Sequence, residues 1–264
     1  MRLHGFRYPW TSVAPVLRRA DVASGNLECG VSRRGDAVPK EFNFRGPPGA
    51  LRPVARYAGF DVLNLANNHV GDYGRTALLD TVRNVRRHGM RAVGAGGSLA
   101  SASAPRIVRR LGLRIAFVGF SNILPASFFA GPARAGTQPA SLPAIGRGVR
   151  RARRRADVVI ATFHWGVERA GRENGRQRAF AAAALRAGAS AVIGAHPHVL
   201  QPIRRRGRRL TAYSLGNFVF SSGGGATSRT GILRLRLSAR GVEGSRLRRA
   251  RIENARPRLV RGAR

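Results

Sequence analysis

The sequence predicts one globular α/β domain. Its 264 residues are enough to bury a full hydrophobic core, and 43% of them are hydrophobic. Short apolar runs typical of buried strands alternate with segments whose apolar residues recur at helical spacing. The 33 glycines suit tight turns between such elements. We expect residues 1–19 to form an irregular N-terminal segment and residues 20–264 to form the single domain.

The first half of the chain alternates between strand and helix patterns. The expected elements are a short strand before Gly25, a helix over 50–58, a strand from Phe60, a helix over 74–88, a strand over 90–93 and a hairpin over 106–109 and 113–120. Glycines at 59 and 89 end the two helices. The segment Ser32–Pro48 is rich in Gly and Pro, and we expect it to be a loop that covers the site.

The second half continues the alternation after an irregular surface excursion over residues 122–142. The expected elements are helices over 142–155 and 175–186, strands over 158–163 and 191–193, a hairpin over 203–206 and 209–214, and strands over 232–237 and 247–252. Arginines alternate with apolar residues in the last two strands, which indicates half-exposed antiparallel pairing.

The charge of the chain is strongly basic. A net charge of +36 arises from 47 arginines, the single lysine Lys40 and only 12 acidic residues. One interpretation is a GC-rich coding sequence that places arginine at ordinary surface positions, and the other is a polyanionic partner. A nucleic-acid partner is disfavoured because no binding motif is recognisable and aromatic residues make up only 7% of the chain.

The sequence predicts a soluble protein. Cys29 is the only cysteine, so no intramolecular disulfide can form. No apolar run approaches the roughly 18 residues of a membrane span, and residues 1–20 lack the apolar core of a signal peptide. Association with the cell envelope would require a signal or anchor upstream of Met1.

Metal-ligating residue types follow four of the expected strands. They are Asn26, Glu28, Asn68, His69, His164, His196 and His198. Neutral imidazole is the commonest metal-ligating side chain, and Pro197 stiffens the turn between the last two histidines. A carboxylate, an amide oxygen and several imidazoles that converge from separate strand ends are the donor set of a hydrolytic two-metal site for Mn, Fe or Zn.

Several of these residues also have structural interpretations. Asn26 could cap a turn, and His69 or His164 could be a hydrogen-bonded core histidine. Only one of Asn67 and Asn68 need face the metals. For Asp72 we favour a role in the turn.

Six motifs resemble the CapA family, which is associated with bacterial capsule and poly-γ-glutamate synthesis and is related to calcineurin-like metallophosphoesterases. They are GNLE at 25–28, LANNH at 65–69, DYG at 72–74, FHWG at 163–166, GAHPH at 194–198 and YSLGNF at 213–218. The resemblance runs from about residue 20 to 220. It implies a metallophosphoesterase-like four-layer sandwich, with two central mixed β-sheets flanked by helices.

The resemblance also implies roles for individual residues. Asn68, His164, His196 and His198 match metal ligands and His69 a general acid, while Glu28, or alternatively Asn26, stands where a bridging acidic ligand is expected. Asn217 belongs to the pattern without an assigned role. The family usually opens with an apolar strand that ends in Gly-Asp and supplies the first acidic ligand, and residues 1–19 contain no Asp or Glu. Either the chain begins too late, or the first metal position is incomplete.

Two functions follow as expectations. The first is a metal-dependent hydrolase of capsule or poly-γ-glutamate biosynthesis, in which two metal ions activate water and His69 protonates the leaving group. Its partners would be an anionic polymer such as poly-γ-glutamate, capsule components and other capsule-synthesis proteins at the membrane. The alternative is a non-catalytic accessory protein that binds an anionic polymer through its arginine-rich surface.

Overall fold

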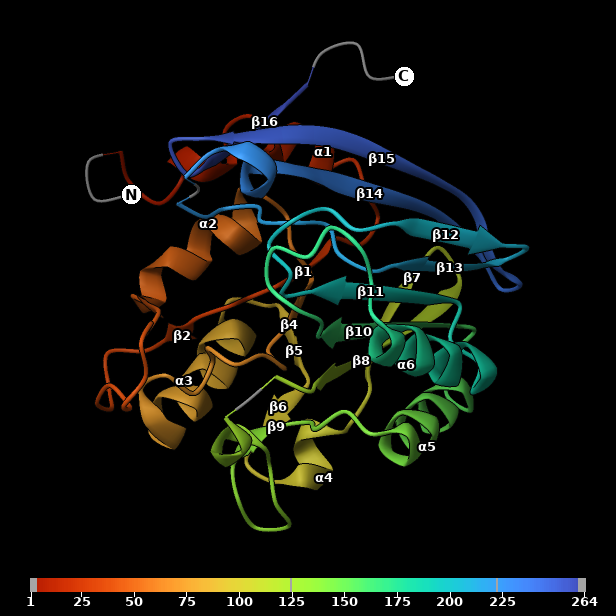
Figure 1. The fold of residues 1–264 in the computed structure, drawn as a ribbon, viewed down its shortest axis with the longest axis horizontal. Helices are drawn as coiled ribbons and strands as arrows, with labels where there is room; N and C mark the ends of the chain where they lie inside the picture. The colour runs from red at the N-terminus through yellow and green to blue at the C-terminus, as the bar shows by residue number, and fades with distance from the viewer. Residues whose placement is uncertain (1–3, 124, 222, 261–264) are drawn as a thin grey trace.

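A six-stranded mixed sheet forms the centre of the protein. The structure, a computed structural model, describes residues 4–123, 125–221 and 223–260 (Figure 1). The strand order is β12-β13-β11-β10-β8-β7. Bounds are β7 Arg106–Arg110, β8 Leu113–Ser121, β10 Val158–His164, β11 Ala191–Ala195, β12 Ile203–Arg206 and β13 Arg209–Ala212. The four middle strands are parallel, and the edge strands β7 and β12 are antiparallel to their neighbours.

Two three-stranded sheets lie on the other side of the β-sandwich. One is parallel with order β1-β4-β5, and its bounds are β1 Ser24–Asn26, β4 Val62–Asn64 and β5 Arg91–Val93. The other is antiparallel, with β14 Arg229–Ser238, β15 Gly241–Glu253 and β16 Arg256–Leu259. Two-stranded pairs join β2 Gly30–Val31 to β3 Arg45–Gly46, and β6 Ala95–Gly96 to β9 Gly136–Thr137.

Helices cover both outer faces of the sandwich (Figure 1). They are α1 Ala14–Leu17, α2 Leu51–Arg56, α3 Gly74–Arg87, α4 Leu99–Ala102, α5 Leu142–Arg153 and α6 Gly175–Arg186, with 3-10 turns at Tyr8–Trp10, Pro48–Ala50, Ala126–Phe128 and Gly225–Ser228. Leu78, Val82 and Val85 of α3 pack in one core with Leu63 of β4. On the opposite side, α5 and α6 pack against β8 and β10. A third core fills the space between the sheets, where Val62 and Val93 join Phe117 and Ile160.

The expected fold class is confirmed. The layers run helix, sheet, sheet, helix, as a metallophosphoesterase-like sandwich requires. The β-layer opposite the six-stranded sheet is divided into one parallel and one antiparallel sheet. The excursion over 122–142 contains β9 and a 3-10 turn, and residues 135–138 are buried. Within residues 1–19, Val13 and Leu17 join the core beside α2 and α3.

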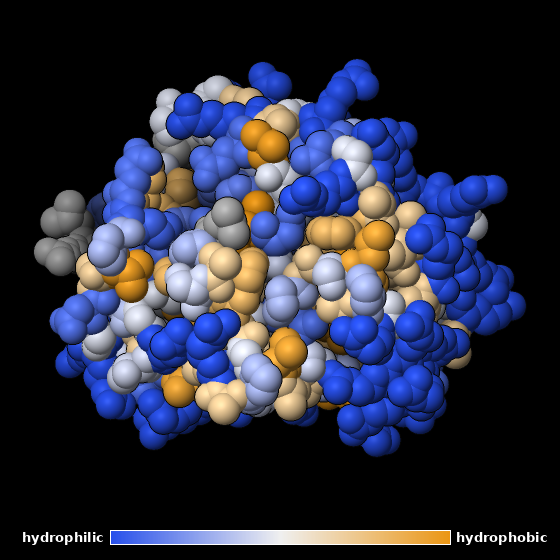
Figure 2. Space-filling view, turned by 60° about the horizontal axis from the view of Figure 1, so that its bottom comes forward, coloured by the Kyte–Doolittle hydropathy of each residue, from blue (hydrophilic) through white to orange (hydrophobic). Residues whose placement is uncertain are grey.

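Hydrophilic side chains dominate the face shown in Figure 2, with small hydrophobic patches between them. Within the described ranges, no helix is both long and apolar enough to cross a membrane.

Candidate metal centre

Four strand ends meet where the two β-layers face each other. Asn26 and Glu28 follow β1, and residues 67–69 follow β4, both from the parallel three-stranded sheet. His164 ends β10 of the six-stranded sheet, and β11, its parallel neighbour, places Ala195 in register with His164. His196 and His198 therefore emerge beside His164. Parallel strands present their carboxyl ends at the same sheet edge, which brings residues far apart in sequence together.

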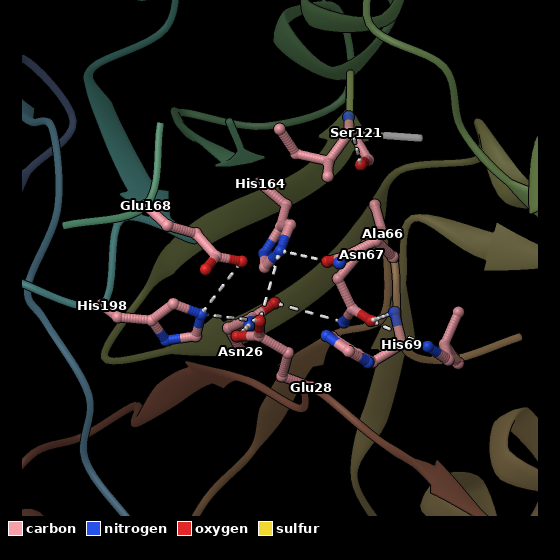
Figure 3. A network of polar contacts seen from close by, with 12 residues as sticks. Asn26, Glu28, Ala66, Asn67, His69, Ser121, His164, Glu168 and His198 are labelled. Atoms are coloured by element: carbon pink, nitrogen blue, oxygen red, sulfur yellow. Dashed lines mark hydrogen bonds and ion pairs between the residues drawn. The ribbon is translucent and has the colours of Figure 1, made fainter. Parts of the chain in front are cut away.

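Glu28 and the histidines form two groups that could hold metal ions. Glu28, His164 and His196 make one group, and Glu168, His196 and His198 make the other, with each group's donor atoms within 4.8 Å of one another. Oε1 of Glu28 lies 3.5 Å from Nε2 of His164 and 3.7 Å from Nε2 of His198. Figure 3 shows Glu28, Glu168, His164 and His198 directed toward a common space. His196 belongs to both groups.

Glu168 was missed in the sequence. Its carboxylate oxygen lies 4.0 Å from Nε2 of His198, and its side chain is 57% exposed. It sits in the loop after β10, outside the strand-end pattern that singled out the other residues. Its position four residues after His164 is the only signal the sequence offered.

Asn68 rather than Asn67 faces the histidines. Because an amide oxygen only accepts, Nε2 of His164 donates to Oδ1 of Asn68 at 2.8 Å. Oδ1 of Asn67 instead accepts the backbone N–H groups of His69 and Val70 and stabilises the turn after β4. The structure therefore separates the two amides, one directed at the site and one folding the loop.

Two further amides orient their neighbours. Nδ2 of Asn26 donates to Oε2 of Glu28 at 3.0 Å, while its Oδ1 accepts from Asn64 at 3.1 Å. Oδ1 of Asn217 accepts from Nδ1 of His198 at 2.7 Å, which leaves Nε2 of His198 free to face the carboxylates. Asn217, to which the sequence assigned no role, thus contacts His198.

The backbone of the His-Pro-His turn is strained. His196 has φ 100° and His198 has φ 59°, both in the left-handed region that non-glycine residues rarely adopt. Such conformations cost about 1–3 kcal/mol each and persist where the surroundings enforce them, often at functional sites. This turn places the His196 ring 4.8 Å from the His164 ring and Nε2 of His198 3.7 Å from Oε1 of Glu28.

The site keeps two of its histidines neutral. Burial, followed by the positive potential of His198 and His69, lowers the pKa of His196 to about 4. Burial and the nearby His196 lower the pKa of His164 well below its ordinary value. Metals bind the neutral imidazole, so neither residue has to lose a positive charge before it binds one.

Glu28 lies where a cation is needed. Burial, followed by the charge of Glu168, raises the pKa of Glu28 to about 8. Among the described residues, Oε1 of Glu28 and Nδ1 of His196 are buried without a hydrogen-bond partner. Unpaired buried acceptors are costly, and a divalent ion would satisfy this carboxylate and favour its charged form. The donor set therefore fits a metal.

A buried ion-pair network holds His69 beside this centre. Nδ1 of His69 donates to Oδ2 of Asp72 at 2.7 Å, and Asp72 is fully buried. Oδ1 of Asp72 accepts from Lys40 Nζ at 2.6 Å. Asp72 lies in the turn before α3, as expected, and its carboxylate also accepts a hydrogen bond from His69. The spacing of three residues after His69 was the available signal, whereas nothing in the sequence placed Lys40 here.

The fold is metallophosphoesterase-like, and the residues that follow its strand ends form a candidate metal centre. The chain belongs to the bacterial capsule synthesis protein family PGA_cap, which matches residues 1–222. The resemblance to CapA proteins is thereby confirmed.

Two named relatives are similar to this chain. The PGA biosynthesis protein CapA of Bacillus subtilis is 34% identical over 87% of this chain and 61% of its own length. The capsule biosynthesis protein CapA of Bacillus anthracis is 32% identical over 90% of this chain and 60% of its own length. The chain thus spans about three fifths of these relatives. A hypothetical protein from Thermus thermophilus shares the fold with a TM-score of 0.54 and 16% identity, over 96% of this chain and 90% of that one.

Proposed function

We propose that this protein is a metal-dependent hydrolase that acts in capsule or poly-γ-glutamate biosynthesis. The observation that carries the proposal is the convergence of a carboxylate, an amide oxygen and three imidazoles on one space, with the Glu28 oxygen lacking a donor among the described residues. Relatives named for PGA and capsule biosynthesis support the biological setting. Other capsule-synthesis proteins at the cell envelope would be its partners.

Two divalent ions, Mn, Fe or Zn, would be held by Glu28, Asn68 and the three histidines, with Glu168 available at the exposed side. When bound, such ions act as Lewis acids and lower the pKa of coordinated water. The protein's own residues prepare the site for them. Asn26 and Asn217 fix Glu28 and His198, and the low pKa values of His164 and His196 keep both imidazoles uncharged.

His69 would act as the general acid. Its Nδ1 donates to Asp72, so Nε2 is the nitrogen left to pass a proton to a leaving group. General acids contribute about 10² to 10⁴ in rate. The variant His69→Ala should therefore lose turnover while it retains metal, and unchanged turnover would remove His69 from the mechanism.

Metal content tests the site directly. We would purify the wild type and a His196→Ala, His198→Ala double variant with Mn supplied, and measure bound metal by elemental mass spectrometry. His88→Ala is the matched control, because His88 lies at the end of α3 and contacts the Asn84 carbonyl instead. Near-stoichiometric metal that only the double variant loses would support the proposal and justify a phosphodiesterase screen. No metal in any of the proteins would contradict it.

A second candidate, non-catalytic binding of an anionic polymer, is favoured by one observation. In the β14–β15 pair, Arg234 stands directly opposite Arg246, and Arg236 and Arg248 lie two residues further along these strands on the same face. Like charges paired across strands destabilise a sheet, so an anionic chain laid along them would relieve the repulsion. Binding to polyglutamate should then weaken steeply between low and moderate salt because counterions are released. Flat binding across that range would exclude this function.

A further inference from the structure

Lys40 is the only lysine in a chain with 47 arginines, and its ammonium lies beside the candidate general acid. Nζ donates to the backbone oxygen of Asn68 at 2.6 Å and to Oδ1 of Asp72 at 2.6 Å, and lies 3.0 Å from Nδ1 of His69. The side chain is only 19% exposed. Lys40 belongs to the Ser32–Pro48 loop, about 30 residues earlier in sequence than the turn it contacts.

Asp72 fastens this loop to the turn that carries His69. Its Oδ2 accepts the backbone N–H of Phe44 at 2.7 Å as well as Nδ1 of His69. Its backbone oxygen accepts the N–H of Val38 at 2.9 Å. Residues 38–44 therefore wrap around one buried carboxylate. The wrap also brings the Phe44 ring to 4.3 Å from the His69 ring.

Lys40 supplies the positive charge in this arrangement. A buried carboxylate is costly unless it is paired and hydrogen-bonded, and Lys40 is the formal cation that contacts Asp72. Without the ammonium, Asp72 would hold the loop by two backbone donors alone. The same ammonium donates to the carbonyl oxygen of Asn68, so it binds residues on both sides of His69 in the sequence.

We infer that Lys40 is a positioning residue: its ammonium clamps residues 38–44 onto Asp72 and thereby fixes the orientation of the His69 imidazole. That this orientation matters for a reaction rests on the proposed function. The contacts of Lys40 with the loop and with Asp72 do not depend on that function. The geometry also explains why lysine stands here. A compact ammonium can meet two oxygens at 2.6 Å in a tight space, and a planar guanidinium presents its donors in a wide fork.

The test uses the metal-free protein, so it needs neither a substrate nor a known activity. We would measure amide hydrogen exchange at Val38 and Phe44, and the NMR resonances of the His69 imidazole, assigned by comparison with His69→Gln. The variants are Lys40→Met and the milder Lys40→Gln. Glutamine retains a hydrogen-bond donor, so Lys40→Gln is used for the test if Lys40→Met does not fold. Arg45→Met is the matched control, because Arg45 binds the Ser32 carbonyl in the same loop and lies over the Tyr73 ring without contacting His69 or Asp72.

Loss of the clamp should accelerate exchange at both amides by about tenfold or more, as expected when a charge-assisted hydrogen bond is removed. The His69 resonances should shift in both Lys40 variants and stay at their wild-type positions in Arg45→Met. Wild-type exchange and wild-type His69 resonances in Lys40→Met and Lys40→Gln would overturn the inference. A failed metal assay with a positive result here would refute the hydrolase proposal and leave the clamp standing.

Discussion

Replacing Glu28 by glutamine should stabilise the metal-free protein and remove its response to metal. In the folded protein the pKa of Glu28 is raised to about 8, against 4.5 when unperturbed. At pH 7 the carboxyl is therefore mostly protonated in the folded state and ionised in the unfolded state, which destabilises the fold. The gap of 2.5 pH units between 4.5 and 7 corresponds to about 3 kcal/mol, since each pKa unit is worth about 1.4 kcal/mol. Because the side chain is 17% exposed, that figure is an upper limit.

The pH dependence gives this prediction its sign. Below about pH 4.5 the carboxyl is neutral in both states, so Glu28→Gln should match the wild type. The advantage of the variant should grow with pH and level off above about 8. The assay is urea denaturation at pH 5, 7 and 8 with EDTA and then with Mn. A variant less stable than the wild type at pH 8 in EDTA, or equally stabilised by Mn, would refute the reasoning.

Three further predictions follow from other contacts. Asn217→Ala frees Nδ1 of His198 and should lower metal affinity by about 10- to 100-fold, measurable by competition with a chelating dye; unchanged affinity would contradict the orienting role. Gly194→Ala drives a Cβ into the backbone carbonyl oxygen of Tyr213 and should destabilise the fold by at least about 2 kcal/mol in denaturant titration, while wild-type stability would show that this space is open. The hydrogen bonds from Arg114 lower the pKa of Asp157 to about 2. The Tm difference between the wild type and Asp157→Asn should therefore be at its maximum above about pH 4 and disappear as the pH falls through 2. A difference that does not change with pH would rule out this ion pair as its source.

The strand ends were predictable because their side chains follow a repeated local pattern. An apolar run followed by His or Asn indicates both a buried strand and the edge where it ends, so His164 and His196 could be placed together before the structure was known. The helices Gly74–Arg87 and Gly175–Arg186 have the bounds expected from their periodicity and closing glycines, within a residue. These strand ends and helix bounds were predictable because they depend on residues that are close together in the sequence.

Residues whose roles depend on loop paths could not be predicted. Asp72 looked like a turn residue because its partners, Lys40 and Phe44, lie about 30 residues away in a segment without periodicity. Glu168 lies in an irregular loop, and only the close approach of β10 and β11 brings it to His198. The division of the second β-layer into two sheets likewise depends on which strands pair with each other in the folded protein. The alternation of apolar and polar residues along one strand does not specify its partner strand.

The location of the site between the two β-layers has a consequence for how the protein unfolds. Glu28 and Asn68 come from the parallel three-stranded sheet, whereas His164 and His196 come from the six-stranded sheet. Each sheet has a core with its own helices, besides the core that lies between the two sheets. An ion bound by all four would cross-link these two halves and add its binding free energy to their joint stability. Metal would then increase the cooperativity of unfolding as well as the midpoint, and chelation would let the halves open at different denaturant concentrations.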